Sequence, residues 1–570
     1  MAELECFPYG TDQTEGVGWL LHMGPYRILL DCGLRELGPL LSRQVPPVDL
    51  VLCSHAHPDH ARGLLSLHRA FPGLPVYASE VTAELLPLNW PNQPAARFCR
   101  ALPWRTPVEF YPGLSAELIP AGHLPGAAAL LLTYRSQSER DDDSGSVGAE
   151  RAYTVFYTGD FLLSNSRLVD GLPLEDLRGL KPDVLIVEGS YGTARFPHRR
   201  QQENQLAERI HRALTDGQSV LMPTITLGLG QELLMLLRSH HHFTGRDLDI
   251  WVDGSVALGC DVYLDMISHF PETVQNFARH QALFWDERIR PRVRRYAHAG
   301  SPKLGQPPCI MLTSQDADLS RYCRHNDTSW LLLLPQHPGR LGEVELTVMQ
   351  ALETSELLQQ RLQSGQLLVE NYLLSDHCDG AGTTQLIHNL RPQHVVFTHG
   401  SSTYLSDLAS LEELQNRYHL HMPAAGTQVS LPIGETFLQP APPETRYEGE
   451  VVEIETAVVI SFSDALTADP RWQSFADTGL VEARWQGEEL VLRSLSQREL
   501  IEPGDEATLE AECCQNCIHC RGQRCRNPLS PLFGFRVTLS GYCPAFEPVP
   551  GVPPADDASK PADSETAVED

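Results

Sequence analysis

The sequence predicts an α/β protein with more than one domain, on the basis of three observations. The chain has 570 residues, which is more than one hydrophobic core usually organises. Short apolar runs bounded by Pro and Gly, such as 26–30 and 48–53, are typical of strands. Helical spacing of apolar residues follows at 200–216 and 230–239, between further strand-like runs. We therefore expect a sheet-rich first part followed by a second α/β region.

The composition is that of a soluble globular protein, and it argues against two classes of function. A net charge of −29 disfavours coating nucleic acid through a general basic surface, although it allows a local basic groove. No segment offers the roughly 20 uninterrupted apolar residues of a membrane span, and the N-terminus lacks a basic signal-peptide start. We expect a cytoplasmic protein without a membrane partner. The cysteines from Cys6 to Cys378 suit reduced, buried thiols.

A histidine-rich loop directly after the strand-like run 48–53 carries the clearest chemical signal. It places three imidazoles and one carboxylate within a few residues: His55, His57, Asp59 and His60. Imidazole nitrogen and carboxylate oxygen are ligands of zinc, and catalytic zinc sites leave a position open for water. Further candidates follow later apolar runs, namely His123, Asp160 and His399. Together these side chains provide enough ligands for two metal ions.

This pattern resembles the His-x-His-x-Asp-His signature of the metallo-β-lactamase superfamily. Later motifs around Glu188, His377 and His399 resemble those of its β-CASP branch, which contains nucleic-acid hydrolases such as RNase J and the endonuclease of pre-mRNA 3′-end processing. The similarity covers roughly residues 1 to 435. It implies a metallo-β-lactamase αββα sandwich with an inserted β-CASP α/β domain.

The resemblance and the changes in composition together suggest domain boundaries. The expected parts are a discontinuous metallo-β-lactamase domain (1–190 and 370–435), a β-CASP domain (191–369), a linker (436–445), a small β-rich or mixed module (446–508), a Cys-rich zinc-binding module (509–548) and a disordered tail (549–570).

The resemblance also implies a role for each candidate ligand. His55, His57 and His123 would bind one zinc ion, Asp59, His60 and His399 would bind the other, and Asp160 would bridge the two. Asp31, which follows the strand-like run 26–30, would orient a ligand imidazole from behind.

The mechanism implied by this site is metal-assisted hydrolysis. Two zinc ions lower the pKa of a shared water, so that hydroxide is available near neutral pH for in-line attack on phosphorus. His377, paired with Glu188, would stay protonated and donate a proton to the leaving 3′ oxygen, and Asp59 would also be needed for catalysis. The leading hypothesis is therefore a zinc-dependent ribonuclease. The alternatives are hydrolysis of a different ester or thioester and a noncatalytic RNA-binding scaffold.

Several positions depart from the usual β-CASP pattern, and they concern the substrate more than the metals. Leu229 stands where the family often has an Arg, so a bidentate phosphate partner is lost. Asp316 and Asp318 add negative charge to a loop expected beside the substrate phosphates. Ser401 and Ser402 replace a common acidic position after His399-Gly400 and are candidate substrate-binding residues.

Basic residues elsewhere in the chain are candidates for holding RNA. Arg195, just after the Glu188 motif, would contact phosphates or simply decorate a solvated helix start. The arginine run, which we define as 288–295, is either an RNA-tracking edge or an exposed face. The triplet 240–242 is expected at a helix C-terminus, without metal.

A cysteine cluster near the C-terminus suggests a second kind of metal site. Its members are Cys514, Cys517, Cys520, Cys525 and Cys543. This spacing favours a structural zinc ion, or else an iron–sulfur cluster, and four thiolates suffice for either. The spacing leaves open which four bind, and whether the module contacts RNA, contacts a protein partner or only stabilises itself. A homodimer, and endo- or exonucleolytic action, also remain open.

Overall fold

The computed structural model describes most of the chain up to residue 433 and short pieces beyond it. The described residues are 4–12, 15–42, 44–91, 93, 97–136, 151–296, 308–324, 328–337, 342–433, 449–454, 457–462, 481–486, 489–494, 517–521 and 524–527. The chain folds into two units, Met1–Pro443 and Glu444–Asp570. The predicted linker and tail lie outside the described residues.

The first sheet of the N-terminal unit has seven strands in the order β20-β1-β2-β3-β4-β5-β6. Its strands are β1 (Leu4–Asp12), β2 (Gly16–Met23), β3 (Tyr26–Leu30), β4 (Leu50–Leu52), β5 (Val76–Ser79), β6 (Cys99–Leu102) and β20 (Val429–Ser430). Pairing is antiparallel from β1 to β3 and parallel from β3 to β6. The predicted strand at 26–30 is confirmed as β3, and β4 lies within the run 48–53.

The second sheet also has seven strands, in the order β19-β18-β11-β10-β9-β8-β7. They are β7 (Val108–Tyr111), β8 (Leu114–Pro120), β9 (Ala128–Arg135), β10 (Ala152–Tyr157), β11 (Val184–Glu188), β18 (His394–Thr398) and β19 (His419–His421). From β10 to β19 the pairing is parallel. Every residue of β11 and β18 is buried, as expected for central parallel strands.

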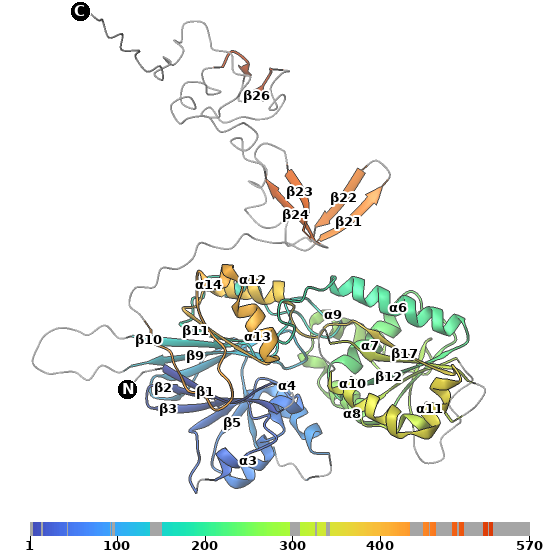
Figure 1. Cartoon of the computed structure of the whole chain (residues 1–570), viewed down its shortest axis with the longest axis horizontal. Helices are drawn as coiled ribbons and strands as arrows, with labels where there is room; N and C mark the ends of the chain where they lie inside the picture. Colours follow the sequence, from blue (N-terminus) through green and yellow to red (C-terminus); the bar gives the residue numbers. More distant parts are fainter. Residues whose placement is uncertain are drawn as a thin grey trace, which may run out of the picture. The chain divides into compact units, whose positions relative to one another are not determined.

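The two sheets pack face to face, and helices cover their outer faces (Figure 1). Trp19 and Leu21 of β2 belong to one buried cluster with Leu130, Tyr157 and Ile186 of the second sheet. The outer helices are α1 (Gly38–Leu41), α2 (Pro58–Ala61), α3 (Leu64–Ala70), α4 (Glu80–Leu85), η1 (Leu86–Asn89), α5 (Leu174–Leu177), α12 (Gly380–Leu390), α13 (Ser402–Ala409) and α14 (Glu412–Gln415). The αββα sandwich predicted from the sequence is confirmed.

A third sheet, with six strands in the order β14-β13-β15-β12-β16-β17, forms a separate lobe of this unit. All its pairings are parallel. The strands are β12 (Ser219–Thr224), β13 (Asp249–Val252), β14 (Arg292–Arg295), β15 (Ile310–Ser314), β16 (Trp330–Pro335) and β17 (Leu367–Tyr372). The two central strands β15 and β12 are buried throughout, because helices cover both faces.

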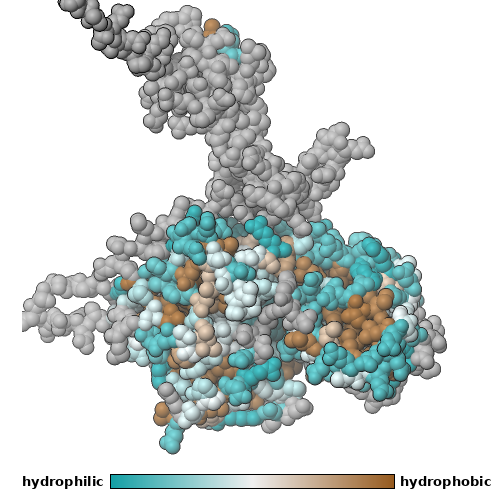
Figure 2. Space-filling model, viewed as in Figure 1, coloured by the Kyte–Doolittle hydropathy of each residue, from teal (hydrophilic) through white to brown (hydrophobic). Residues whose placement is uncertain are grey.

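The helices of this lobe divide between the two faces of the third sheet. They are α6 (Arg199–Thr215), α7 (Leu229–Ser239), α8 (Gly254–Asp265), η2 (Ile267–His269), α9 (Glu272–His280), η3 (Leu319–Arg321), α10 (Glu343–Thr354) and α11 (Glu356–Gln363). Side chains of α6 to α9 share a core with Val220 and Ile310, whereas α10 and α11 pack against Leu221 and Met311. Figure 2 shows mostly hydrophilic surface on the unit, with a hydrophobic area over this lobe.

The chain enters and leaves the third-sheet lobe between two neighbouring strands of the second sheet. The lobe follows β11 and ends before α12 and β18, and β11 pairs in parallel with β18 from Val184 opposite His394 to Glu188 opposite Thr398. The lobe is therefore an insertion into the sandwich. Its entry and exit both lie at the carboxyl edge of the second sheet, which is where ligands of open α/β sheets gather.

The described part of the second unit consists of hairpins. The strands are β21 (Gly449–Ile454), β22 (Ala457–Phe462), β23 (Val481–Gln486), β24 (Glu489–Ser494), β25 (Cys520–Arg521) and β26 (Arg524–Cys525). They pair antiparallel as β21–β22, β23–β24 and β25–β26. Across the described residues of both units, no helix is both long and apolar enough to span a bilayer.

Candidate metal centre

The histidine-rich loop lies at the carboxyl edge of the first sheet, between β4 and α2. His57 precedes the helix in extended conformation, and Pro58 begins it, which suits a residue that has no backbone N–H to satisfy. The side chains of His55 and His60 are fully buried, and His57 is nearly so. The loop therefore presents its imidazoles to the interior between the sheets and not to solvent.

Asp31 anchors this loop from the end of β3. Its carboxylate accepts hydrogen bonds from the Ser54 backbone N–H (2.6 Å), the Ser54 hydroxyl (2.7 Å) and the Tyr157 hydroxyl (2.6 Å). It also accepts one from Nδ1 of His60 at 2.8 Å. Because Nδ1 donates to Asp31, Nε2 of His60 is left as the acceptor that faces the centre.

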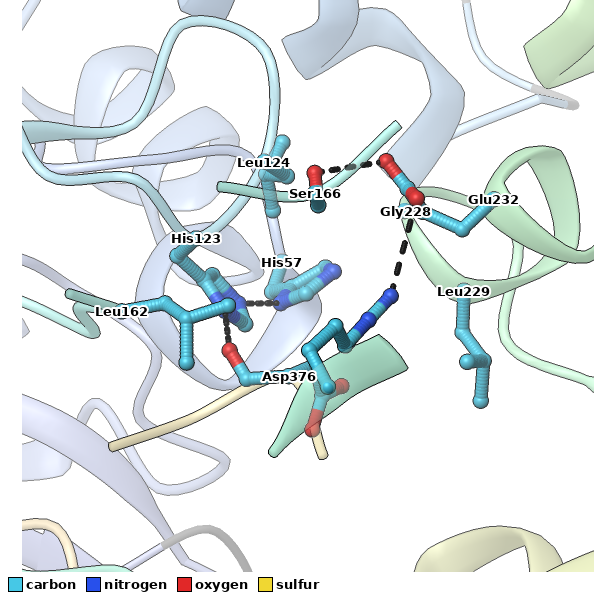
Figure 3. Close-up of a pocket in the computed structure, with 10 residues that line it drawn as sticks. His57, His123, Leu124, Leu162, Ser166, Gly228, Leu229, Glu232 and Asp376 are labelled. Atoms are coloured by element: carbon cyan, nitrogen blue, oxygen red, sulfur yellow. Dashed lines mark hydrogen bonds and ion pairs between the residues drawn. The ribbon is translucent and has the colours of Figure 1, made fainter. Parts of the chain in front are cut away.

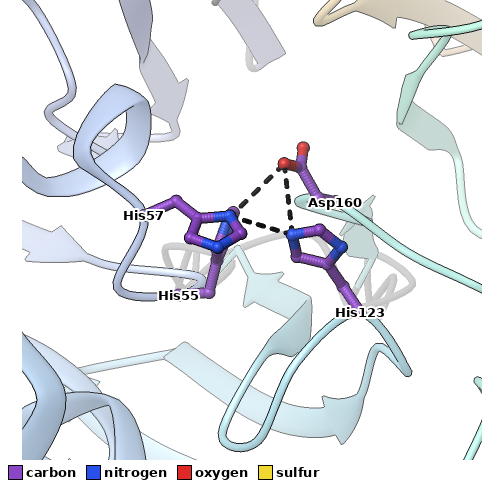
Figure 4. Close-up of side chains that lie close together, drawn as sticks. All are labelled: His55, His57, His123 and Asp160. Carbon is purple, nitrogen blue, oxygen red and sulfur yellow. Dashed lines mark hydrogen bonds and ion pairs between the residues drawn. The ribbon is translucent and has the colours of Figure 1, made fainter. Parts of the chain in front are cut away.

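A first group of possible ligands combines the histidine loop with two residues from the second sheet. The ligand atoms of His55, His57, His123 and Asp160 all lie within 4.8 Å of one another. Figure 4 shows the three rings and the carboxylate turned toward a common point. Nδ1 of His57 is 3.0 Å from Nε2 of His123, and Oδ2 of Asp160 is 3.5 Å from Nε2 of His55.

A second group lies on the other side of Asp160. It consists of Asp59, His60 and His399, again with ligand atoms within 4.8 Å. Nε2 of His399 is 3.2 Å from Oδ2 of Asp59. Oδ1 of Asp160 is 3.3 Å from Nε2 of His60 and 3.2 Å from Nδ1 of His399. Asp160 thus directs one carboxylate oxygen toward each group, which is the arrangement expected of a ligand that bridges two ions.

The polar atoms of these two groups fit metal ions better than they fit one another. Nε2 of His55, Nε2 of His60 and Oδ1 of Asp160 are buried without any hydrogen-bond partner, a costly state for polar atoms in a protein interior. Burial, followed by the neighbouring His123, lowers the pKa of His57 to about 4. Its imidazole is therefore neutral at physiological pH, which is the form that binds a metal.

His377 and Glu188 form a buried ion pair beside the first group. Nδ1 of His377 is 2.8 Å from Oε2 of Glu188 and 3.8 Å from Oδ2 of Asp160. Burial alone lowers the pKa of His377, but the charges of Glu188, Asp376 and Asp160 outweigh it and raise the pKa to about 10. His377 thus holds a proton at neutral pH next to the candidate metal centre.

Glu188 is itself fixed by neighbouring donors. Its Oε1 accepts the backbone N–H of Phe161 at 2.6 Å, and its Oε2 accepts the hydroxyl of Ser190. Because both carboxylate oxygens are engaged, the side chain cannot rotate away from His377 without losing a hydrogen bond.

Two residues of α6 hold the segment that carries His377, a role that the sequence indicated for neither. Arg199 donates to the carbonyl of Ser375, and Gln202 accepts the Ser375 backbone N–H at 2.8 Å. On the opposite side, Nδ1 of His123 donates to the carbonyl of Asp376 at 2.7 Å. The inserted lobe therefore positions the His377 segment against the sandwich.

A narrow pocket beside His57 and His123 shows how the two lobes are joined (Figure 3). Glu232, in the first turn of α7, accepts the hydroxyl of Ser166 at 2.8 Å and the backbone N–H groups of Arg167 and Leu168 at 2.9 Å. Nη2 of Arg199 lies 3.5 Å from Glu232. These buried bonds fix the inserted lobe relative to the metal-binding loops.

A larger cleft opens over both candidate metal groups, with a volume of about 1430 Å³ that includes space open to solvent. The sandwich contributes His57, Asp59, Arg62, Asn89, Asp160 and His377 to its lining, and the inserted lobe contributes Thr226, Ser255, Ser314, Gln315, Asp316, His337 and Glu343, among others. Asp316, singled out in the sequence for its charge, does line the cleft.

The predicted substrate-binding residues Ser401, Ser402 and Arg195 are not among the residues that line the cleft. Ser401 instead caps α13, where its hydroxyl accepts the backbone N–H of Tyr404 at 3.3 Å. Arg195 is exposed. A role for these three side chains in substrate binding stays a prediction.

The arginine run is neutralised by acids, some of which directly precede it and some of which come from other segments. Arg292 contacts Asp247 and Asp249, each at 2.6 Å, and Arg295 pairs with Asp261. Arg288, Arg290 and Arg294 pair with Asp286, Asp247 and Glu287 at 3.5 to 3.6 Å. This favours an ordinary exposed edge over an RNA-tracking surface.

The histidine triplet 240–242 ends α7, as the sequence predicts. Its ligand atoms lie close together, but partners already engage them. Nε2 of His240 is 3.2 Å from the side-chain oxygen of Asn204, and Nε2 of His242 is 3.0 Å from Glu208. The triplet therefore lacks the partnerless buried atoms of the centre.

Part of the C-terminal cysteine cluster lies within the described residues. Cys520 and Cys525 face each other across the β25–β26 hairpin, and Cys517 is buried beside it. Cys514 and Cys543 lie outside the described residues. A metal ion at this cluster remains a prediction.

Comparisons with known proteins agree with this geometry. Residues 26–222 match the family model of the beta-lactamase superfamily domain, and residues 366–423 match that of the Zn-dependent metallo-hydrolase RNA specificity domain. An uncharacterised protein of Synechocystis is 48% identical over 96% of this chain and 97% of its own length.

Two further relatives carry functional names. Ribonuclease TTHA0252 of Thermus thermophilus is 31% identical over 48% of this chain and 63% of its own length. Integrator complex subunit 11 of Gallus gallus is 23% identical over 76% of each chain. From the two matched family models, the near full-length relative and these relatives, we conclude that the chain belongs to the β-CASP branch of the metallo-β-lactamase superfamily, whose members are metal-dependent hydrolases.

Proposed function

We propose that this protein is a zinc-dependent ribonuclease that hydrolyses RNA phosphodiester bonds. The observation that carries the proposal is the buried His377–Glu188 pair beside Asp160, because it adds a proton donor to a centre able to hold two ions. The similarity to proteins named ribonucleases, and to an RNA specificity domain over 366–423, supports RNA as the substrate.

In this proposal the two groups described above each hold one zinc ion. His55, His57 and His123 would hold the first, Asp59, His60 and His399 would hold the second, and Asp160, whose ligand atoms lie near both groups, would be shared. When bound, the ions supply Lewis-acid stabilisation and an activated water for attack on phosphorus. The partnerless nitrogens of His55 and His60 support this assignment.

The residues of the chain orient the ligands and move the proton. Asp31 fixes the ring of His60 so that Nε2 faces the centre. His377 keeps its proton because Nδ1 is bonded to Glu188, and its ring lines the cleft where the scissile bond would lie. Nε2–H of His377 is then the donor to the leaving 3′ oxygen. Glu188 stabilises the imidazolium of His377 while it keeps the hydrogen bonds that it accepts from Phe161 and Ser190.

The acidic side chains of the cleft favour a second candidate function. Asp316 and Glu343 both line the cavity, and negative charge disfavours a polyanion there. Hydrolysis of an uncharged ester or thioester by the same centre is therefore the alternative. For the C-terminal cysteines we retain a structural zinc ion or an iron–sulfur cluster as a separate proposal.

The test is cleavage of end-labelled RNA and DNA of one sequence, with 5′ hydroxyl, monophosphate and triphosphate ends, by the zinc-loaded protein. We expect RNA cleavage that both Asp59→Ala and His377→Ala abolish. His377→Ala should retain two zinc ions per centre, whereas Asp59→Ala should lose metal. If the wild-type protein cleaves RNA no faster than the two variants but hydrolyses a thioester, the alternative function replaces the ribonuclease proposal.

A further inference from the structure

Arg62 lies at the edge of the cleft, one turn from the proposed metal ligands. It caps the C-terminus of α2, the helix that carries Asp59 and His60, and its backbone N–H bonds to the carbonyl of Pro58. Its side chain is tied at the base, since Nε donates to the same Pro58 carbonyl at 2.9 Å. Arg62 is one of the residues that line the cleft.

The guanidinium of Arg62 has no acidic partner, although it is partly buried. Nη2 is shielded from solvent and has no hydrogen-bond partner, and the ion pairs among the described residues do not include Arg62. The charges that act on it at longer range are those of Asp59 and Glu343, opposed by Arg35. Asp59 is already engaged, because its Oδ2 lies 3.2 Å from Nε2 of His399.

Arg199 provides a contrast within the same region. Its side chain is also buried, but it lies 3.7 Å from Glu203 and 3.5 Å from Glu232, and it donates to the carbonyl of Ser375. The charge of Arg199 is thus compensated by two acids, although its Nε, like Nη2 of Arg62, has no hydrogen-bond partner. Arg62 instead carries an uncompensated charge at a cavity wall, which is costly unless an anion arrives there.

We propose that Arg62 binds a phosphate of the RNA strand in the cleft, next to the scissile phosphate. This inference rests on the proposed ribonuclease function. Among the described residues that line the cleft, Arg62 supplies the only arginine or lysine side chain, beside the acids Asp316 and Glu343. A planar guanidinium matches two phosphate oxygens at once and can form a charge-assisted bidentate contact. Arg62 would therefore position the strand and would not take part in bond cleavage.

The test compares Arg62→Gln, Arg62→Lys and a matched control, Arg69→Gln, in the full-length zinc-loaded protein. Arg69 lies on α3, near Arg62 in the chain, but its side chain is exposed and donates to Gln93. We expect Arg62→Gln to raise KM for a single-stranded RNA about tenfold or more, with kcat changed less than about twofold. Arg62→Lys should restore part of the affinity, and Arg69→Gln should change neither parameter.

The salt dependence of binding separates a phosphate contact from a structural role. The slope of log KM against log salt concentration should fall by about one in Arg62→Gln and return in Arg62→Lys. An unchanged KM in Arg62→Gln, an equal effect of Arg69→Gln, or a loss of kcat or bound zinc without a change in slope would overturn the proposal.

A binding measurement distinguishes failure of this inference from failure of the proposed function. Fluorescence anisotropy of the same labelled RNA with His377→Ala, with and without Arg62→Gln, requires no cleavage. If the wild-type protein cuts no RNA, but His377→Ala binds RNA and Arg62→Gln weakens that binding, the phosphate contact is supported and the ribonuclease function is rejected. If RNA is cut but Arg62→Gln binds as tightly as its parent, the inference alone fails.

Discussion

Charged or metal-binding side chains are concentrated in two segments, the histidine loop 54–60 with Arg62 and the arginine run 288–295. The surroundings of the two segments differ. In the loop, the polar atoms of His55, His60 and Arg62 include buried ones without a hydrogen-bond partner. In the run, acids from neighbouring segments pair with the arginines, as Asp249 does with Arg292 at 2.6 Å. The run also holds such an atom, Nε of Arg294, but each of its arginines has an acid within 4 Å. Convergence of buried ligand atoms, and not density of charge, marks the region that awaits a ligand.

We expect the largest effect from a substitution of Asp160, because this carboxylate contacts both groups of proposed metal ligands. Asp160→Asn removes the charge but keeps the volume, so we expect fewer than two zinc ions per centre and an activity lower by roughly a thousandfold. Metal analysis after gel filtration, together with RNA cleavage rates, measures both. Full zinc content with wild-type rates would show that the partnerless Oδ1 of Asp160 is not a ligand.

A smaller effect is expected at Asp31, which touches the ligands only through His60. In Asp31→Asn the amide still fits, but it replaces a carboxylate that accepts from Nδ1 of His60 at 2.8 Å. Loss of that orientation should weaken zinc binding about 10- to 100-fold. Competition with a chelator of known affinity measures the change. The control is Asp49→Asn, a half-buried carboxylate just before β4 that pairs with Arg27, and equal effects of the two variants would argue against an orienting role.

These examples also show what the sequence could and could not predict. The ligands in the loop 54–60 are adjacent in the chain, so their spacing alone indicated a metal site. The support of His377 by Arg199 and Gln202 joins residues more than 170 positions apart, and no periodicity or motif reports such a contact. Individual strands were predictable because buried strands leave apolar runs, whereas their arrangement in a sandwich was implied by the resemblance to the metallo-β-lactamase superfamily.

The arginine run and Arg62 show the same limit of sequence reasoning. Clustering left a binding edge and an exposed face both open for the run, because its partners Asp247 and Asp261 lie more than 30 positions away in the chain. Arg62 attracted no attention because it stands alone. Whether a cation is free depends on partners that only the folded chain brings together.

A third prediction sharpens the contrast at the arginine run. Arg292→Gln breaks ion pairs with Asp247 and Asp249. The side chains of Arg292 and Asp249 are largely shielded from solvent, whereas that of Asp247 is exposed. We expect a loss of about 1 kcal/mol in the free energy of unfolding, with KM for RNA unchanged. Denaturant unfolding and cleavage kinetics on the same preparation test both parts. A rise in KM and a lower salt slope would restore the run as an RNA contact.

The smallest effect concerns histidines that are already satisfied, and it appears as a dependence of stability on pH. His394 lies far from the ligand cluster at the start of β18, where its Nδ1 is 2.9 Å from Nε2 of His421 and its Nε2 donates to the carbonyl of Pro432. Burial, then the neighbouring His394, lowers the pKa of His421 to about 4, and burial also lowers that of His394. Two imidazoles bonded in this way cannot both be protonated without losing their contact.

Since these pKa values are lower in the folded than in the unfolded protein, the unfolded state binds more protons between about pH 4 and 6.5. Stability should therefore be constant above about pH 7 and fall as the pH drops through 6.5, by about 1 kcal/mol at pH 5.5. His421→Gln should remove much of this slope in the zinc-loaded protein, where the ligand histidines are held by metal. Urea unfolding at pH 7.5 and 5.5 measures the difference, and an equal slope in both proteins would assign the pH dependence to other groups.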